Sequence, residues 1–186
     1  MNDLHLKQAI RTCEQGGVIA YPTEAVFGLG CLPHYEHSVR RILYLKHRSI
    51  KKGLICVAAD IRQLAVYVDF DKVPRLRLES IEKSWPGPVT WLIPAKKYTP
   101  YWLTGDHDTL AVRVSAHPLI KALCDCLGPI VSTSANLHGS SSARSTQRVR
   151  AYFRDNVDYI FPGNISKKRN PTEIRDGLSG KIVRAH

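Results

Sequence analysis

The sequence contains a run of small polar residues, Ser132-Thr133-Ser134-Ala135-Asn136, whose hydroxyl and amide groups could bind a ligand. The run follows a Gly-Pro turn and the short apolar segment 129–131, which together predict a buried strand. The polar side chains would then stand at the carboxyl end of a strand, where open α/β sheets bind ligands. A helix cap or a Ser/Thr turn is the structural alternative, and it is the more common role of an isolated Ser–Asn pair. Basic residues elsewhere in the chain favour the ligand-binding interpretation.

The net charge of the 186-residue chain points to an anionic partner. Lysine and arginine number 27 against 16 acidic residues, which gives a formal net charge of +11. Such an excess is typical of proteins that bind nucleic acids or phosphorylated small molecules, and the charge alone does not distinguish the two. The composition is otherwise that of an ordinary globular protein, with 44% hydrophobic and 23% charged residues.

A cationic stretch lies between Glu36 and Asp60, where the sequence has no acidic residue. Its members are Arg40, Arg41, Lys46, Arg48, Lys51 and Lys52. Cations near the carboxyl end of a helix are a structural alternative, and it accounts for the two arginines at the start of the stretch. Lys46, Arg48 and Lys52 come shortly before a predicted buried strand, where a mobile lysine charge and a planar arginine fork together suit a polyphosphate.

Arg113 interrupts an apolar strand predicted for residues 109–115. A buried charge without compensation is destabilising by several kcal/mol, so Arg113 needs an anionic partner. That partner is either a protein carboxylate, in an internal salt bridge, or the carboxylate or phosphate of a ligand. Thr23 also has two interpretations, because its hydroxyl either caps the following segment or stands at the end of another strand. Arg144 and Arg184 are typical of surface arginines when taken alone.

Several common nucleotide-binding and catalytic motifs are absent from the sequence. It has no P-loop, Gly28-Leu29-Gly30 does not continue into a Gly-x-Gly-x-x-Gly fingerprint, and no Gly-x-Ser-x-Gly elbow surrounds Ser132 or Ser134. The eight histidines lack a His-Glu-x-x-His pattern and the five cysteines lack Cys-x-x-Cys spacing, so we expect no metal site and reduced cysteines. Neither an apolar signal segment nor an apolar run of membrane-spanning length occurs, so we expect a soluble, cytoplasmic chain with no membrane partner.

Alternating helical and strand patterns predict the elements that position these residues. Helices are expected at 4–13, 34–47, 60–68, 73–85, 118–127 and 146–153. Strands are expected at 18–21, 54–59, 89–94, 109–115, 129–131 and 159–162, with a terminal hairpin formed by 172–176 and 181–184. A loop or broken helix is expected at 22–31, and loops at 98–105, 138–145 and 167–171. Because strands and helices alternate without a linker, we predict one domain, residues 1–186, built on a mixed α/β sheet with helices on its faces.

Taken together, segments distributed along the chain resemble motifs of the YrdC-like family of threonylcarbamoyl-AMP synthases. They are 16–30 (GGVIAYPTEAVFGLG), Lys46-His47-Arg48 with Lys52-Gly53-Leu54-Ile55, Trp85-Pro86-Gly87-Pro88-Val89-Thr90, Ala111-Val112-Arg113-Val114, Ser132-Thr133-Ser134-Ala135-Asn136, and Pro171-Thr172-Glu173-Ile174-Arg175-Asp176 with Arg184. They follow the order of the family and cover essentially the whole chain, so the match is specific. The chain looks like the short, single-domain bacterial form, because nothing follows the catalytic domain.

The resemblance implies a twisted, open sheet with a concave, positively charged cavity. It also implies a reaction in which L-threonine, bicarbonate or CO2, and ATP give threonylcarbamoyl-AMP and pyrophosphate. Partner enzymes, the threonylcarbamoyl transferase machinery, would then modify the adenosine beside the anticodon of tRNA. Mg²⁺ is expected to arrive with ATP, bridging its phosphates, so no dedicated protein site is implied for the metal. Phosphoryl chemistry of this kind relies on positioning and charge neutralisation rather than on a protein nucleophile.

The same resemblance implies roles for individual residues. The catalytic residues would be Lys46, Arg48, Ser134 and Asn136. The ATP-binding residues would be Lys46, Arg48, Lys52, Asn136, Arg144 and Arg184. The threonine-binding residues would be Thr23, Arg113, Ser134 and Thr172, with Arg113 meeting the carboxylate of the substrate. The family usually places proline after Lys-x-Arg, whereas this chain has Ser49, a departure that changes the rigidity of the loop but not its charge.

A basic RNA-binding module, such as a tRNA or rRNA maturation factor, is the alternative from a different functional class. It predicts exposed, dispersed basic residues and a steep dependence of binding on salt. The synthase predicts instead that the cationic side chains converge with the Ser-x-Asn segment in one pocket. Arg113, which lies within a core strand, favours the synthase. Weak binding of tRNA is compatible with both, because the product serves tRNA modification.

Overall fold

The structure of the protein is a computed structural model that describes residues 3–165 and 173–185. Its helices are α1 (Asp3–Glu14), α2 (Glu36–Leu45), α3 (Ile61–Leu64), α4 (Arg75–Ser84), α5 (Tyr101–Thr104), α6 (Pro118–Leu127) and α7 (Thr146–Phe153). Its strands are β1 (Ile19–Pro22), β2 (Phe27–Cys31), β3 (Ile55–Ala58), β4 (Val89–Pro94), β5 (Thr109–Val114), β6 (Ile130–Ser134), β7 (Tyr159–Ile160), β8 (Glu173–Asp176) and β9 (Ile182–Arg184). None of the helices in these two ranges has the length and apolar character needed to span a bilayer.

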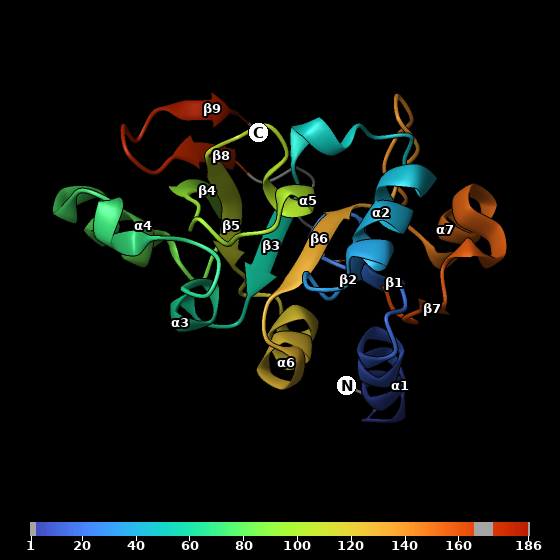
Figure 1. The fold of residues 1–186 in the computed structure, drawn as a ribbon. Coiled ribbons are helices and arrows are strands. Elements are labelled where there is room, and N and C mark those ends of the chain that lie inside the picture. Colours follow the sequence, from blue (N-terminus) through green and yellow to red (C-terminus); the bar gives the residue numbers. More distant parts are fainter. Residues whose placement is uncertain (1–2, 166–172, 186) are drawn as a thin grey trace.

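The strands of the described residues pair into a single mixed sheet (Figure 1). Their order across the sheet is β7-β1-β2-β6-β3-β5-β4-β8-β9, and the pairs β1–β7, β3–β5 and β4–β8 are parallel. β6 runs antiparallel to both of its neighbours, β2 and β3, so the strand that leads into the Ser-x-Asn segment lies well inside the sheet. The predicted mixed α/β sheet with helices on its faces is confirmed.

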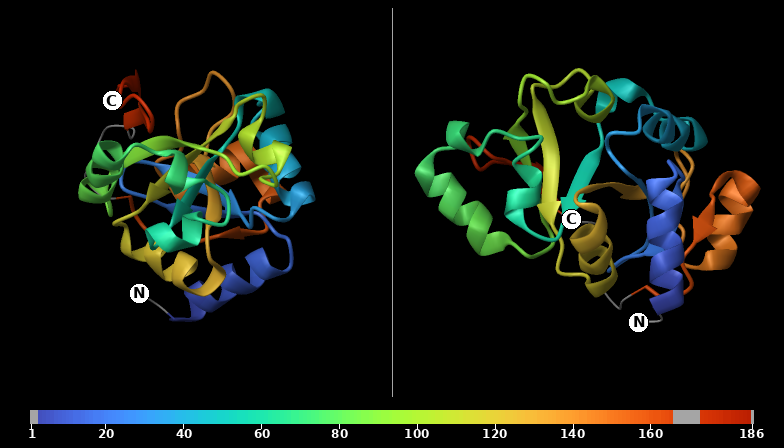
Figure 2. Two further views of the ribbon diagram at one scale, coloured as in Figure 1. Left: turned by 60° about the vertical axis from the view of Figure 1, so that its left-hand side comes forward. Right: turned by 60° about the horizontal axis from the view of Figure 1, so that its bottom comes forward.

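Side chains that alternate along each strand give the sheet two different faces. On one face, Leu110, Val112 and Val114 of β5 join a large core cluster with buried residues of α2, α3, α4 and α7. On the opposite face, α1 and α6 lie side by side and pack against β1 and the start of β6 (Figure 1; Figure 2). These two helices cover only part of this face, and beyond them alternate residues of β3, β4 and β5 line a cavity.

The prediction of a loop or broken helix at residues 22–31 is wrong, because most of this segment belongs to the β1–β2 hairpin. The glycines of β2 make room for Tyr21 of β1, since a Cβ atom at Gly30 would lie 2.8 Å from the tyrosine ring. The hydroxyl of the fully buried Tyr21 donates to Ser132 Oγ at 2.7 Å, and burial raises the pKa of the tyrosine well above its usual value. The ring of Tyr21 therefore replaces the side chains that β2 lacks.

The ends of other predicted elements also move. The strand predicted at 129–131 continues to the end of β6, so Ser132 and Ser134 lie within the strand and face the cavity. Residues 98–105 contain the short helix α5 rather than only a loop. The terminal hairpin is confirmed as β8 and β9, while the loop predicted at 167–171 lies outside the described residues. All five cysteines are unpaired, and four of them are buried.

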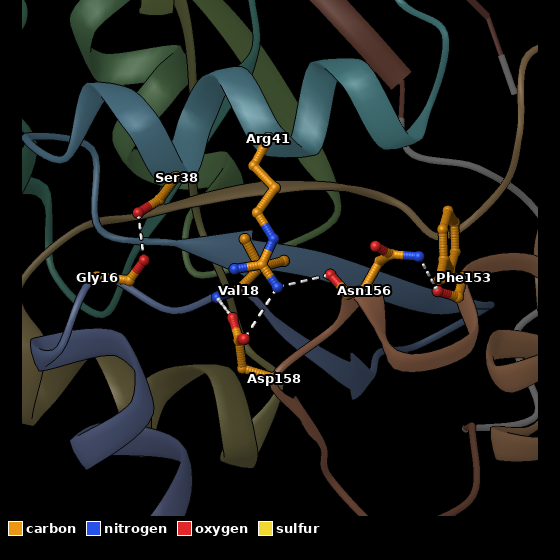
Figure 3. Close-up of polar contacts among 7 residues, drawn as sticks. All are labelled: Gly16, Val18, Ser38, Arg41, Phe153, Asn156 and Asp158. Carbon is orange, nitrogen blue, oxygen red and sulfur yellow. Dashed lines mark hydrogen bonds and ion pairs between the residues drawn. The ribbon is translucent and has the colours of Figure 1, made fainter.

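Polar contacts fix α2 to the strands beside it (Figure 3). Arg41 of α2 donates hydrogen bonds to Asn156 O at 2.7 Å and to Asp158 Oδ1 at 2.9 Å. The other carboxylate oxygen of Asp158 accepts the backbone N–H of Val18, next to β1, at 2.7 Å. The hydroxyl of Ser38 adds a hydrogen bond to the backbone of the loop before β1. These contacts hold α2 in place, and the predicted phosphate-binding segment begins at the carboxyl end of this helix.

Candidate active site

A cavity of about 550 Å³ opens on the part of the sheet that α1 and α6 leave uncovered. Its floor consists of alternate residues of neighbouring strands: Ile55 and Val57 of β3, Thr90 and Leu92 of β4, Thr109, Ala111 and Arg113 of β5, and Ser132 and Ser134 of β6. Residues of the β1–β2 turn, of the segment 48–54 and of β9 contribute to the walls, as do Leu103, Thr104, His107 and Ser142. Segments that are far apart in the sequence thus meet around a volume of the size that small-molecule sites have.

The lining of the cavity is positively charged. Its described part carries the cations Arg48, Lys52, Arg113 and Arg184 and a single carboxylate, Glu24. Burial, and after it repulsion from Arg184, lowers the pKa of Arg48. The Nε atom of Arg48 is buried without a hydrogen-bond partner, while Nη2 donates to two backbone oxygens of the following turn. Cations held this close together, with donors still available, indicate a site for a multiply charged anion.

Arg113 is 6% exposed and lines the cavity from β5. Its Nη2 atom lies 4.0 Å from Oε2 of Glu24, and its Nε atom has no hydrogen-bond partner. Of the two partners considered for this charge, the internal carboxylate is therefore present but only loosely engaged. The guanidinium keeps donors available for the carboxylate or phosphate of a ligand.

Lys46 is not part of the lining. The residue is 5% exposed, and its ammonium donates to the backbone oxygen of Ser134, to Asn136 O at 3.1 Å and to Asn136 Oδ1 at 3.0 Å. Burial, and after it repulsion from Arg48, lowers the pKa of Lys46 to about 8. The three protons of the ammonium thus match three oxygens of the turn after β6. Contact between Lys46 and the triphosphate stays a prediction.

Asn136 also supports the cavity from behind its lining. Its Oδ1 atom accepts the hydroxyl of Ser134 at 2.7 Å as well as the ammonium of Lys46. Its Nδ2 atom donates to the backbone oxygens of Leu137 and Ser140, each at 3.0 Å. The amide therefore fixes the turn that presents Ser134, whose side chain does line the cavity. This network joins the Lys-x-Arg and Ser-x-Asn segments.

The backbone conformation at the end of α2 explains why the side chains of Lys46 and Arg48 lie in different places. His47, between them, adopts a left-handed conformation with a φ of 49°. The N–H of Arg48 donates to Leu43 O at 2.9 Å and that of His47 to Tyr44 O at 3.0 Å, which is the pattern of a Schellman motif. The chain turns sharply here, so Lys46 stays against the turn after β6 while Arg48 reaches the cavity.

The structure does not bring all of the other predicted residues to the cavity. The predicted residues in the lining are Thr23, Arg48, Lys52, Arg113, Ser134 and Arg184. The hydroxyl of the buried Thr23 donates to Val26 O at 2.6 Å and closes the β1–β2 turn. Arg144 is exposed and is not part of the lining. Thr172 lies outside the described residues.

The polar lining also includes residues that sequence reasoning missed. They are Glu24, Thr90, Thr104, His107, Thr109 and Ser142. The two-residue period of a strand could have identified Thr109, because it places this residue on the same face as Arg113. Glu24 offered no such signal, since an acidic residue directly after Thr23 is equally typical of a helix start. Only the folded sheet brings it opposite Arg113.

Comparisons with known proteins agree on one family. The Sua5/YciO/YrdC model, described as "Telomere recombination", matches residues 11–186. A threonylcarbamoyl-AMP synthase of Pseudomonas fluorescens (strain Pf0-1) is 47% identical over 184 residues, which are 99% of this chain and 98% of the relative. The structure of P. abyssi Sua5 complexed with L-threonine superposes with a TM-score of 0.85 at 31% identity, covering 92% of this chain and 50% of that chain. The structure of E. coli YciO superposes with a TM-score of 0.83 at 26% identity, covering 96% of this chain and 87% of that chain.

The extent of these matches differs between the relatives. This chain spans about half the length of the Sua5 structure but nearly all of the Pseudomonas synthase. The family match covers almost the whole sequence, and it agrees with the resemblance noted in the motifs. Because sequence and fold point to the same relatives, the chain belongs to the Sua5/YciO/YrdC family.

Proposed function

We propose that this protein is a threonylcarbamoyl-AMP synthase, which converts L-threonine, bicarbonate or CO2, and ATP to threonylcarbamoyl-AMP and pyrophosphate. The observation that carries the proposal is the convergence of Arg48, Lys52, Arg113 and Arg184 on one cavity beside Ser134. The Pseudomonas relative described above carries the name of this activity. An RNA-binding module would instead predict dispersed basic residues, so the convergence favours the synthase.

The positions of the cations along β3 and β5 support an end-to-end arrangement of the two larger substrates. Arg113 of β5 lies opposite Val57, two residues beyond the start of β3 at Ile55. Two residues of a strand span roughly 7 Å. Arg113 is therefore separated by about this distance from the amino end of β3, which Arg48 and Lys52 precede in the chain. Threonine would bind at the Arg113 end, with its carboxylate on the guanidinium, and the triphosphate at the other end. The proposal also keeps the expected contacts of Thr23 and Thr172 with threonine and of Arg144 and Arg184 with the nucleotide.

The lining suits a reaction that needs positioned charges rather than a protein nucleophile. An oxygen of the carbamate formed from threonine attacks the α-phosphorus of ATP, the α–β phosphoanhydride bond breaks, and pyrophosphate leaves with that electron pair. The cations beside Arg48 would neutralise the charge on the phosphates. Ser134 would stand between the two substrates, held in place by Lys46 and Asn136.

Mg²⁺ would reach the cavity as part of the ATP complex. Among the described lining residues, Glu24 is the one carboxylate. The described residues also contain no group of three His, Cys, Asp or Glu side chains placed to hold a metal ion. Phosphate oxygens and water, which are ligands that Mg²⁺ prefers, would complete its coordination.

The partners of the reaction follow from its product. Threonylcarbamoyl-AMP would pass to the threonylcarbamoyl transferase machinery that acts on tRNA, in the cytoplasm. Weak binding of RNA by this chain is part of the proposal, since the net charge of +11 exceeds what the cavity alone holds.

A product assay tests the proposed function. Purified protein is incubated with ATP, Mg²⁺, bicarbonate and labelled threonine, and we expect a labelled adenylate together with an equal amount of pyrophosphate. Arg48→Ala should suppress both products, whereas Arg75→Ala should not, because Arg75 lies on the exposed side of α4. Pyrophosphate release that does not depend on threonine would contradict the proposal. Tight, salt-sensitive binding of tRNA without any adenylate would favour the RNA-binding module instead.

A further inference from the structure

Glu24 lies in the turn between β1 and β2 and lines the cavity opposite Arg113. Its Oε2 atom is 4.0 Å from Nη2 of Arg113, and its Oε1 atom accepts the hydroxyl of Ser115 at 3.4 Å. The oxygen of that hydroxyl accepts the backbone N–H of His117 at 3.1 Å, which leaves its proton free to point toward Glu24. The carboxylate is thus kept near Arg113 by long contacts, without a short hydrogen bond to either partner.

The pair formed by Glu24 and Arg113 is more open than a paired arginine and carboxylate normally are. Charge-assisted hydrogen bonds of this type are about 2.7–2.9 Å long and are often bidentate. Here the side chains are only 21% and 7% exposed, yet their nearest charged atoms remain 4.0 Å apart. The Nε atom of Arg113 has no partner at all. Two opposite charges that are sheltered from water and only loosely engaged leave hydrogen-bonding capacity for a ligand that carries both charges.

An α-amino acid carries a carboxylate and an ammonium, which are the counter-charges of Arg113 and Glu24. Its ammonium nitrogen and the nearer carboxylate oxygen are roughly 3 Å apart, because one Cα atom joins them. A carboxylate placed on Arg113 would therefore bring the ammonium within reach of Glu24 without a large movement of either side chain. Glu24 is also the only carboxylate in the described lining, so an ammonium has no other acidic partner there.

We infer that Glu24 binds the ammonium group of the amino-acid substrate while Arg113 binds its carboxylate, so that the pair selects a free zwitterionic amino acid. The inference rests on the proposed function and names a specificity-determining residue for it. The hydroxy acid 2,3-dihydroxybutanoate, which has a hydroxyl group in place of the ammonium of threonine, keeps the contact with Arg113 and offers Glu24 a neutral donor in place of a charged one. Replacing the charged donor by a neutral one corresponds to about a 10-fold weaker affinity.

Calorimetric titration in the absence of ATP and bicarbonate tests this inference. The wild-type protein should bind L-threonine at least about 10-fold more tightly than the hydroxy acid. In Glu24→Gln the two affinities should become similar, through a loss of threonine affinity with little change for the hydroxy acid. Glu24→Asp keeps the charge and should retain a preference for threonine. Glu82→Gln, at an exposed position of α4, is the matched control and should behave as the wild type does.

The outcomes separate this inference from simpler roles of Glu24. If the carboxylate only positions Arg113, Glu24→Gln weakens both ligands by the same factor and leaves their ratio unchanged, which overturns the inference. If it serves Mg²⁺ instead, the ratio is again unchanged and only the Mg²⁺ dependence of ATP binding shifts. A wild-type protein that binds no threonine contradicts the proposed function as well, whereas an unchanged ratio contradicts the role of Glu24 alone. Should Glu24→Gln fail to fold, loss of the preference in Glu24→Asp would still count against the role of the charge.

Discussion

Replacing Lys46 by methionine tests whether its ammonium holds the turn after β6. The change keeps an unbranched side chain but removes the charge and its three donors. Asn136 O would lose its bond to the ammonium, whereas Ser134 O would keep the N–H of Asn136 at 3.0 Å. Asn136 Oδ1 would keep the hydroxyl of Ser134. The variant loses hydrogen bonds from a charged donor and leaves the carbonyl of Asn136 without its partner. We therefore expect the free energy of unfolding to fall by about 1–3 kcal/mol.

Urea unfolding near neutral pH measures this change in the free energy of unfolding. Lys52→Met is the matched control, because Lys52 is exposed and its replacement should change the stability by less than about 0.5 kcal/mol. Backbone hydrogen exchange of residues 134–140 should become faster in Lys46→Met and stay unchanged in the control. The two measurements together report whether the turn, and not the whole fold, loses its support.

Activity provides a second readout for the same variant. Since Lys46 is not part of the lining, the Kd for ATP should rise less in Lys46→Met than in Lys52→Met. Turnover to pyrophosphate should nevertheless fall, because Ser134 loses its fixed position. The reasoning is refuted if Lys46→Met keeps the stability and exchange of the wild type and weakens ATP binding as strongly as Lys52→Met does. The lysine would then contact the phosphates directly.

The remaining predictions concern ligand binding, packing, the backbone and pH. Arg113→Met should weaken threonine binding at least about 10-fold in calorimetry and leave ATP affinity nearly unchanged, because one charge-assisted contact is lost. Tyr21→Phe should lower the free energy of unfolding by about 1 kcal/mol in urea, since it removes the hydrogen bond to Ser132. Ser49→Pro should retain wild-type turnover, because the φ of −60° at Ser49 already suits proline. The pKa of Lys46 falls from its ordinary value of 10.5 to about 8 on folding, so the unfolded chain binds more protons between these values. The stability of the wild type relative to Lys46→Met should therefore rise by up to about 3 kcal/mol over that pH range.

Each of these predictions has a result that would contradict it. Unchanged threonine affinity in Arg113→Met would remove the guanidinium from the amino-acid site, and equal stability of Tyr21→Phe would show that the bond to Ser132 contributes nothing. A collapse of turnover in Ser49→Pro would show that the loop needs a conformation that proline forbids. If the stability difference between the wild type and Lys46→Met does not change above pH 8, the pKa of Lys46 is not lowered on folding.

Elements with local signals at both ends could be predicted from the sequence. α6, α7 and β4 occupy the predicted ranges 118–127, 146–153 and 89–94. Pro118 stands in the first turn of α6, and Gly128 ends the helix with a φ of 74°. Ser145 caps α7 by accepting the N–H of Arg148 at 3.2 Å. Where a helix or strand is defined by its own residues, the pattern is sufficient.

Features that depend on distant contacts could not be predicted in this way. β2 has glycine at every second position, which is typical of a loop until the ring of Tyr21 is known to lie over it. Lys46 and Arg48 are two residues apart, and only the left-handed turn at His47 sends one behind the cavity and the other into it. A glycine at that position would have signalled the turn, whereas histidine does not. The helix predicted at 60–68 similarly shortens to α3, and after it Val68 forms a bridge with Ala95 and Tyr67 O accepts the N–H of Lys96 at 3.0 Å.

The two faces of the sheet are encoded by interleaved positions of the same strands. In β5, Leu110 and Val112 belong to the hydrophobic core, while Ala111 and Arg113 face the cavity. Adjacent residues of β5 therefore have different roles, one in the packing of the core and the next in the lining of the cavity. A mutant library restricted to the cavity-facing codons of β5 would vary the lining of the cavity while leaving the core on the other face of the sheet unchanged. Shifting the same library by a single codon would instead yield mostly insoluble protein.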